Sequence, residues 1–110
     1  MKSSKEDIET FLDDVYQALD QGLYSPVDRK KNTDCLAMLG WKWQDAFDEL
    51  YDLKHEDYYR GPLIDRECPT DDDFWEFKKK IQGKYIYIKL KIKYSKDNSL
   101  LLFSFHIDGM

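Results

Sequence analysis

The chain has 110 residues, of which 42% are hydrophobic and 15% aromatic, and its formal net charge at pH 7 is −5. This size predicts a single domain over residues 1–110 with one modest core. No run approaches the ~20 apolar residues of a membrane span, and MKSSKEDIET at the N-terminus lacks the apolar core of a signal peptide. Two distant cysteines without zinc-ligand spacing favour a reducing cytoplasm, and we expect no metal and no cofactor.

Charge is divided unevenly along the chain. Residues 1–77 contain nine Lys and Arg against twenty Asp and Glu, whereas residues 78–110 contain eight Lys against two Asp. The overall acidity argues against nonspecific nucleic-acid binding, although the basic C-terminal third could form a local patch for an anion. The acidic part could be a surface for a basic partner, or it could simply keep the domain soluble.

The first half of the chain has helical periodicity, over about residues 4–54. Apolar residues recur every three or four positions in residues 5–20, with Ser4 available as an N-cap and Gly22 ending the helix. The connector SPVDRKKN leads to a second short helix, which Asn32 or Thr33 could cap and Gly40 closes. A third helix is expected over about residues 43–53.

In the second half of the chain, over about residues 73–108, apolar residues recur at every second position. After the loop HEDYYRGPLIDRECPTDDD, which has room for a short extended segment near Tyr58 and Tyr59, the strands read FWEFKKKI, KYIYIKLKIKY and SLLLFSFHI. The turns QG and SKDN between them predict a three-stranded antiparallel meander. Helices followed by strands indicate an α+β domain with the helices packed on one face of the sheet.

Alternation along the strands predicts which side chains share a face. The core face should carry Trp75, Phe77 and Ile81, the even residues from 86 to 92, and the odd set Leu101, Phe103, Phe105 and Ile107. The opposite face collects Glu76, Lys78, Tyr87, Lys89, Ser104 and His106. Turn lengths place Tyr87 opposite His106, Lys89 opposite Ser104, Glu76 opposite Lys89 and Lys78 opposite Tyr87, to within one pairing step.

This second face has two interpretations. A carboxylate, a phenol, an imidazole and several amines can together perform acid–base chemistry on a phosphodiester, and histidine suits proton transfer because its unperturbed pKa is about 6.5. An ordinary solvated sheet face, with cross-strand Glu–Lys pairs of about 0.2–1 kcal/mol each, accounts for the same residues.

Three runs of the chain resemble one protein family. RKKNTDCLAMLGWKWQDAFDELYDLKHEDYYRGPLIDR, then FWEFKKKIQGKYIYIKLKIKY and LLFSFHI, are similar in order and spacing to the MqsR-like toxins of bacterial type II toxin–antitoxin systems, relatives of the RelE-type mRNA interferases. The resemblance covers about residues 28–107. It implies a RelE-like fold and metal-independent endoribonuclease activity on mRNA, either free or bound to the ribosome. It also implies inhibition by a protein antitoxin.

The resemblance also implies site residues. Matched by position, the catalytic residues fall on Arg60, Glu76, Tyr87 and His106, of which only Tyr87 keeps the residue type of the family. His106 and Glu76 would exchange protons with the RNA, in either order. The alternation of side chains along the strands and the resemblance together predict four substrate contacts: Lys78, Lys89, Lys91 and Ser104.

Two alternatives to a nuclease stay open. A noncatalytic binding module could keep the same scaffold and use Lys89 and Lys91 to hold RNA or an acidic protein. The acidic helical half could instead dock a basic protein through Asp13, Asp14 and Asp20.

Overall fold

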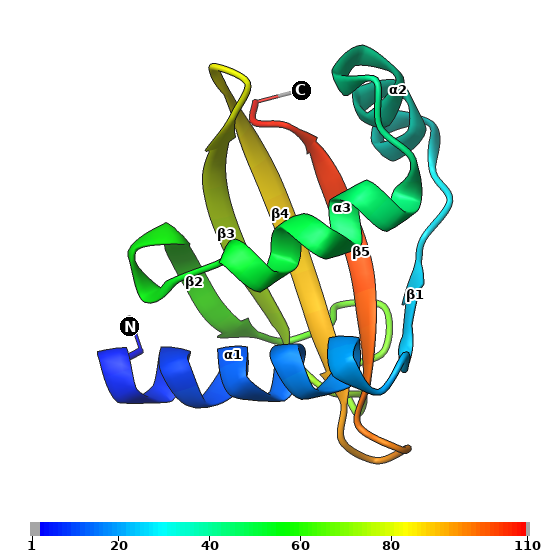
Figure 1. The fold of residues 1–110 in the computed structure, drawn as a ribbon. Coiled ribbons are helices and arrows are strands. Elements are labelled where there is room, and N and C mark those ends of the chain that lie inside the picture. The colour runs from blue at the N-terminus through cyan, green and yellow to red at the C-terminus, as the bar shows by residue number, and fades with distance from the viewer. Residues whose placement is uncertain (1–2, 110) are drawn as a thin grey trace.

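The computed structural model describes residues 3–109, which form an α+β domain with helices packed against a five-stranded sheet (Figure 1). The helices are α1 (Lys5–Asp20), α2 (Lys30–Leu39) and α3 (Trp43–Glu49), and two 3-10 turns follow them, η1 (Leu50–Asp52) and η2 (His55–Asp57). The strands are β1 (Tyr24–Pro26), β2 (Tyr58–Leu63), β3 (Phe74–Ile81), β4 (Lys84–Lys93) and β5 (Ser99–Ile107). The predicted fold class is confirmed.

The helix ends agree with the sequence at α1 and differ at α2. Ser4 caps α1 as predicted, because its hydroxyl accepts a hydrogen bond of 3.1 Å from the backbone N–H of Asp7. Gly40 ends α2 in the left-handed conformation, at φ 72°. The prediction that Asn32 or Thr33 caps α2 is wrong, because the helix begins at Lys30 and Asn32 is fully buried inside it.

The sheet has the order β1-β5-β4-β3-β2, and all pairs are antiparallel except β1 with β5. The predicted meander of β3, β4 and β5 is confirmed and forms the centre. Both edge strands come from segments that the sequence marked as connector or loop. A three-residue strand that ends at Pro26 is too short to show a period of two.

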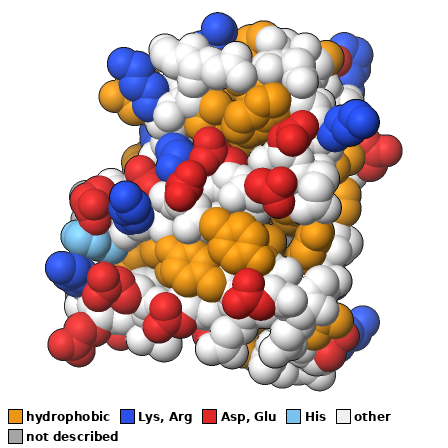
Figure 2. Space-filling model, in the orientation of Figure 1, with side chains coloured by type: hydrophobic (Ala, Val, Ile, Leu, Met, Phe, Trp, Pro, Cys, Tyr) orange, Lys and Arg blue, Asp and Glu red, His pale blue; other side chains and the backbone are white. Residues whose placement is uncertain are grey.

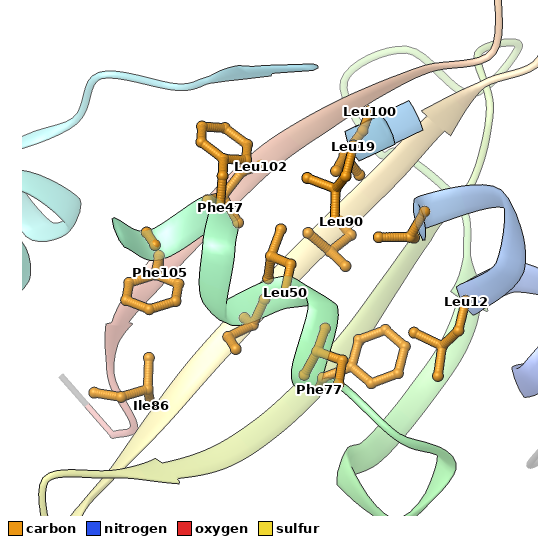
Figure 3. Close-up of a cluster of buried hydrophobic side chains, with 14 of the residues drawn as sticks. Leu12, Leu19, Phe47, Leu50, Phe77, Ile86, Leu90, Leu100, Leu102 and Phe105 are labelled. Carbon is orange, nitrogen blue, oxygen red and sulfur yellow. The ribbon is translucent and has the colours of Figure 1, made fainter. Parts of the chain in front are cut away.

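The core lies between the sheet and the helices α1 and α3, which cross the same face (Figures 1 and 3). Side chains exposed by 0–1% include Val15 from α1, Leu50 from η1, and Ile86, Ile88, Leu90 and Ile92 from β4. The even face of β4 is therefore the buried one, as the alternation predicted. Burial of such a side chain stabilises the fold by about 1.5–3 kcal/mol.

A β-bulge changes the faces of β5. Lys89 pairs with Ser104, but the next residue, Leu90, pairs with Leu102, so Phe103 is an extra residue in the strand. Leu102 therefore points into the core, while Leu101 pairs with Lys91 on the opposite face. The prediction that Leu101 and Phe103 face the core is wrong, because a strand that is apolar on both sides does not specify its register.

Within residues 3–109, no helix combines the length and the apolar composition needed to span a membrane.

Candidate functional site

The face of the sheet opposite the helices carries the predicted polar cluster. We call it the polar face; its predicted members are Glu76, Lys78, Tyr87, Lys89, Ser104 and His106. All four predicted pairings are those observed: Glu76 with Lys89, Lys78 with Tyr87, Tyr87 with His106, and Lys89 with Ser104. The regular alternation of β3 and β4 and the two short turns made this register predictable.

Arg60 reaches this cluster from the edge strand β2, where it pairs with Glu76 of β3. Its Nε donates a hydrogen bond of 2.6 Å to Oε1 of Glu76. The Glu76 side chain is 2% exposed and the Arg60 side chain 57%. A buried carboxylate needs such a partner, because an unpaired charge away from water is costly. The pair thus fixes one edge of the guanidinium and leaves its outer part accessible.

Tyr87 and His106 lie side by side on β4 and β5. Their ring centroids are 5.2 Å apart, at 42°. Nδ1 of His106 is 3.0 Å from the carbonyl oxygen of Ile107, which can only accept, so the neutral imidazole carries its hydrogen on Nδ1. Nε2 is then the lone-pair nitrogen. Burial, and secondarily the hydrogen bond with Glu76, raise the pKa of Tyr87, so its phenol is protonated at neutral pH.

Lys78 lies at the margin of this group. Its ammonium is 3.9 Å from the centroid of the Tyr59 ring and 3.2 Å from a carboxylate oxygen of Asp108. The side chain is 31% exposed. Lys78 therefore lies opposite Tyr87 and already has a carboxylate partner in Asp108; its role as a substrate contact stays a prediction.

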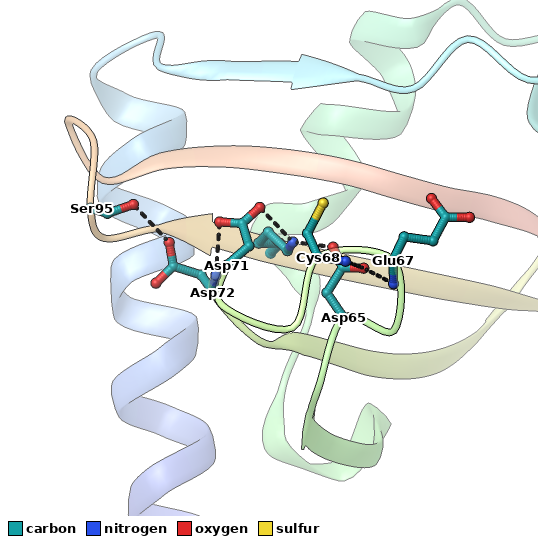
Figure 4. Close-up of polar contacts among 7 residues, drawn as sticks. Asp65, Glu67, Cys68, Asp71, Asp72 and Ser95 are labelled. Carbon is teal, nitrogen blue, oxygen red and sulfur yellow. Dashed lines mark hydrogen bonds and ion pairs between the residues drawn. The ribbon is translucent and has the colours of Figure 1, made fainter.

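Lys91 has a structural role in place of the predicted substrate contact. Its side chain is 2% exposed, and its ammonium lies 2.7 Å from Asp65 and 3.1 Å from Asp71, in the loop of residues 64–73 (Figure 4). Asp65 also accepts hydrogen bonds from the backbone N–H groups of Glu67 and Cys68. Lys91 therefore ties this loop to the sheet and has no exposed ammonium for RNA.

Arg29, which the sequence reading missed, contacts the same face from the start of α2. Its Nη2 donates a hydrogen bond of 2.9 Å to Oγ of Ser104, and its guanidinium lies 4.6 Å from the centroid of the Phe103 ring. The ammonium of Lys89 lies 5.2 Å from the same ring and 4.4 Å from that of Phe74. The only sequence signal was the cationic run RKK, which lay in a segment interpreted as connector.

Asn32 explains why Arg29 is held there. The Asn32 side chain donates to the carbonyl oxygens of Val27, at 2.9 Å, and Phe103, at 3.1 Å, and accepts from the N–H of Phe105, at 3.0 Å. These bonds satisfy backbone groups on both sides of the bulge in β5. They also fasten the first turn of α2 to that strand, which places Arg29 above Phe103.

Metal-binding side chains are dispersed across the described part of the chain. Over residues 3–109, no three His, Cys, Asp or Glu side chains are grouped in a way that could hold a metal ion. Cys35 is buried and Cys68 exposed, and both are free thiols. The polar face instead offers an imidazole, a phenol and the cations Arg29, Arg60, Lys78 and Lys89, which suits an anionic ligand.

Comparison with models of known protein families gives no match for this chain. A search of curated proteins likewise finds no significant relative.

Proposed function

We propose that the protein is a metal-independent endoribonuclease related to the MqsR-like toxins, which cuts RNA through attack of a 2′-hydroxyl on the adjacent phosphate. The observation that carries the proposal is the meeting of four side chains from four strands. Arg60 and Glu76 form one pair, and Tyr87 and His106 form the other; the Glu76 carboxylate also contributes to the raised pKa of Tyr87. The imidazole can move a proton, and the guanidinium can stabilise phosphate charge.

In the proposed reaction, Nε2 of His106 accepts the proton of the 2′-hydroxyl. The bond between the 2′-oxygen and phosphorus forms, and the bond to the 5′-oxygen breaks. The outer nitrogens of Arg60 stabilise the charge on the phosphoryl oxygens, because guanidinium matches their geometry. Water protonates the leaving 5′-oxygen, since this site is not enclosed on the Arg60 side, and the hydroxide that remains takes the proton from His106, which returns to its neutral form. The products are a 2′,3′-cyclic phosphate and a 5′-hydroxyl.

Glu76 has a positioning role in this proposal, whereas the sequence resemblance gave it a share in proton transfer. Its side chain is 2% exposed and one oxygen is bound to Arg60, so a 2′-hydroxyl cannot readily approach it. Glu76 instead orients the guanidinium and keeps Tyr87 protonated.

The proposal includes a protein antitoxin and a cytoplasmic location. A groove of about 550 Å³ on the helix side is lined by three acidic residues, two apolar or aromatic ones and two basic ones: Glu9, Asp13, Glu56, Leu12, Tyr16, Lys54 and His55. Figure 2 shows acidic side chains around apolar patches on this side of the molecule. Such a surface fits a basic, partly apolar segment of a partner. An antitoxin bound there would act from the side opposite the polar face.

A direct test is to incubate the protein with end-labelled RNA in EDTA and to identify the new ends. We expect cyclic-phosphate and 5′-hydroxyl ends from the wild type and none from His106→Ala. Lys5→Gln, in an exposed position on α1, should cut like the wild type. RNA that is bound but not cut would favour the noncatalytic alternative, for which the low exposure of His106, 9%, is the supporting observation.

A further inference from the structure

Two cations on the polar face lack the carboxylate partners that their neighbours have. Arg60, Lys78 and Lys91 each form an ion pair. Within residues 3–109, neither Arg29 nor Lys89 pairs with a carboxylate; Arg29 forms one side-chain hydrogen bond, to Ser104, and Lys89 lies over aromatic rings. A positively charged spot without its own anion is a candidate for an anion from outside.

The surroundings of Arg29 are partly shielded from water. Its Nε is buried and has no hydrogen-bond partner in the described part of the chain, and Ser104 beside it is 2% exposed. Most buried donors in proteins are satisfied, so a buried guanidinium nitrogen without a partner is unusual. An anion at the outer edge of the guanidinium would stabilise the positive charge of Arg29. Water and salt would screen this attraction less than at an open surface.

The two cations also contact the same aromatic ring. Both lie over the ring of Phe103, Arg29 at 4.6 Å and Lys89 at 5.2 Å from its centroid. The Lys89 ammonium also lies over the ring of Phe74, whose centroid is 4.9 Å from that of Phe103. Two like charges near one ring repel each other, and a bound anion would offset this repulsion. The ring attracts each cation but cannot replace such an anion.

The spacing along β5 relates this place to the proposed cutting site. Ser104 and His106 are alternate residues that face the same side, and they pair regularly with Lys89 and Tyr87. Two residues of a strand span about 7 Å. This is comparable to the separation of successive phosphates in an extended single strand of RNA.

We propose that Arg29 and Lys89 form a second phosphate site, which binds the phosphate next to the one that is cut in a single-stranded RNA. This inference rests on the proposed function, because it takes the position of His106 as the cutting site. Arg29 supplies a planar fork of donors and Lys89 a point charge, while the buried Ser104 hydroxyl holds the guanidinium in place. The RNA backbone then runs along β4 and β5.

The test measures binding separately from cutting. All variants are made in the His106→Ala background, and the affinity for a short labelled RNA is followed by fluorescence anisotropy over a series of salt concentrations. Arg29→Gln and Lys89→Gln should each weaken binding about tenfold at low salt. Each should also lower the slope of log K against log salt by about 0.7, the value for one phosphate contact on a single strand. Arg29→Lys should retain the slope, and Lys5→Gln should retain both quantities.

Thermal melting identifies any variant that fails to fold. Lys89→Gln leaves the hydrogen bond between Arg29 and Ser104 intact, so it tests the phosphate site without disturbing the position of Arg29. Unchanged affinity and slope in both Gln variants would overturn the inference, whatever the cleavage results. Salt-dependent binding that needs both residues, in a protein that cuts no RNA, would uphold the site and reject the nuclease. Equal competition by inorganic phosphate and by a trinucleotide, at equal phosphate concentration, would indicate a free-anion site and overturn the RNA assignment.

Discussion

Arg60 and Glu76 form an ion pair in which the two charges are very unequally exposed. The bond from Nε to Oε1 is 2.6 Å, the Glu76 side chain is 2% exposed and the Arg60 side chain 57%. The buried partner therefore depends on the exposed one. This relation separates the roles in the proposed site: Glu76 organises its neighbours, Arg60 faces the substrate, and His106 moves the proton.

The first prediction concerns the stability of this pair. Arg60→Met should lower the free energy of unfolding by about 1–3 kcal/mol, because it leaves a buried carboxylate without its partner. Glu76→Gln should cost less, since water can solvate the exposed Arg60. The double variant should recover most of the loss of Arg60→Met, which urea denaturation at pH 7 can measure. A double variant as unstable as the sum of the single ones would contradict the described dependence.

The second prediction concerns acid stability. The pKa of Asp65 is lowered mainly by its hydrogen bond with Lys91, and that of Asp71 by the backbone N–H of Asp72 and then by Lys91. The unfolded carboxyls have pKa values near 3.9, so the unfolded state binds more protons than the folded state in this range. The stabilisation is complete above about pH 5 and is lost as the pH falls through the folded pKa values.

Lys91→Met tests this relation, because it removes the cation and keeps the length of the side chain. The free energy of unfolding of this variant should fall less between pH 5 and pH 2 than that of the wild type. Lys5→Gln, made in an exposed position, is the control and should follow the wild-type curve. Parallel curves for Lys91→Met and the wild type would show that the loop does not depend on this ion pair.

The third prediction concerns Tyr87, whose raised pKa results from burial and from the Glu76 carboxylate. In the folded protein the phenol stays protonated above pH 10, where an unfolded tyrosine ionises. The folded state then binds more protons, so this group lowers stability as the pH rises past 10. Tyr87→Phe should lose stability less steeply between pH 9.5 and 11, by urea denaturation. An unchanged slope would mean that Tyr87 ionises like an exposed tyrosine.

The fourth prediction concerns Asn32. Its side chain bonds to Val27, Phe103 and Phe105, so Asn32→Ala leaves buried backbone groups without partners. We expect a loss of about 3 kcal/mol in the free energy of unfolding, since each unsatisfied group costs about 1–3 kcal/mol and relaxation recovers part of this. Thr33→Ala is the matched control. If Thr33 capped α2, its removal would cost about 1 kcal/mol; in the observed position it should cost less.

The strands were predictable from the sequence where their two sides differ. Ile86, Ile88 and Tyr87 alternate strictly between core and polar face, and the short turns left one register that buries the apolar set. The bulge at Phe103 was not predictable in this way, because LLLFSF is apolar on both sides and either register hides hydrophobic residues.

Only the contacts between neighbouring strands of the polar face could be predicted from the sequence. Tyr87 and His106 follow from neighbouring strands joined by one turn, whereas Arg29 meets Ser104 across 75 positions of the chain. That contact depends on the edge strand β1 and on the buried Asn32, neither of which has a recognisable pattern. Lys91 has the same place in the alternation as Lys89. The loop of residues 64–73 gives Lys91 its carboxylate partners, whereas Lys89 has none within residues 3–109.

The proposed attack of a 2′-hydroxyl, assisted by His106, can be tested by a single change in the RNA. The cut position is first mapped on an RNA oligonucleotide, and the rate is then measured on the same oligonucleotide with a single 2′-deoxy nucleotide on the 5′ side of that bond. The account predicts that this one change abolishes cutting there while binding, measured by anisotropy, stays within a factor of about two. Cutting of the 2′-deoxy oligonucleotide at the same bond would contradict the account, because the attacking oxygen would then come from elsewhere.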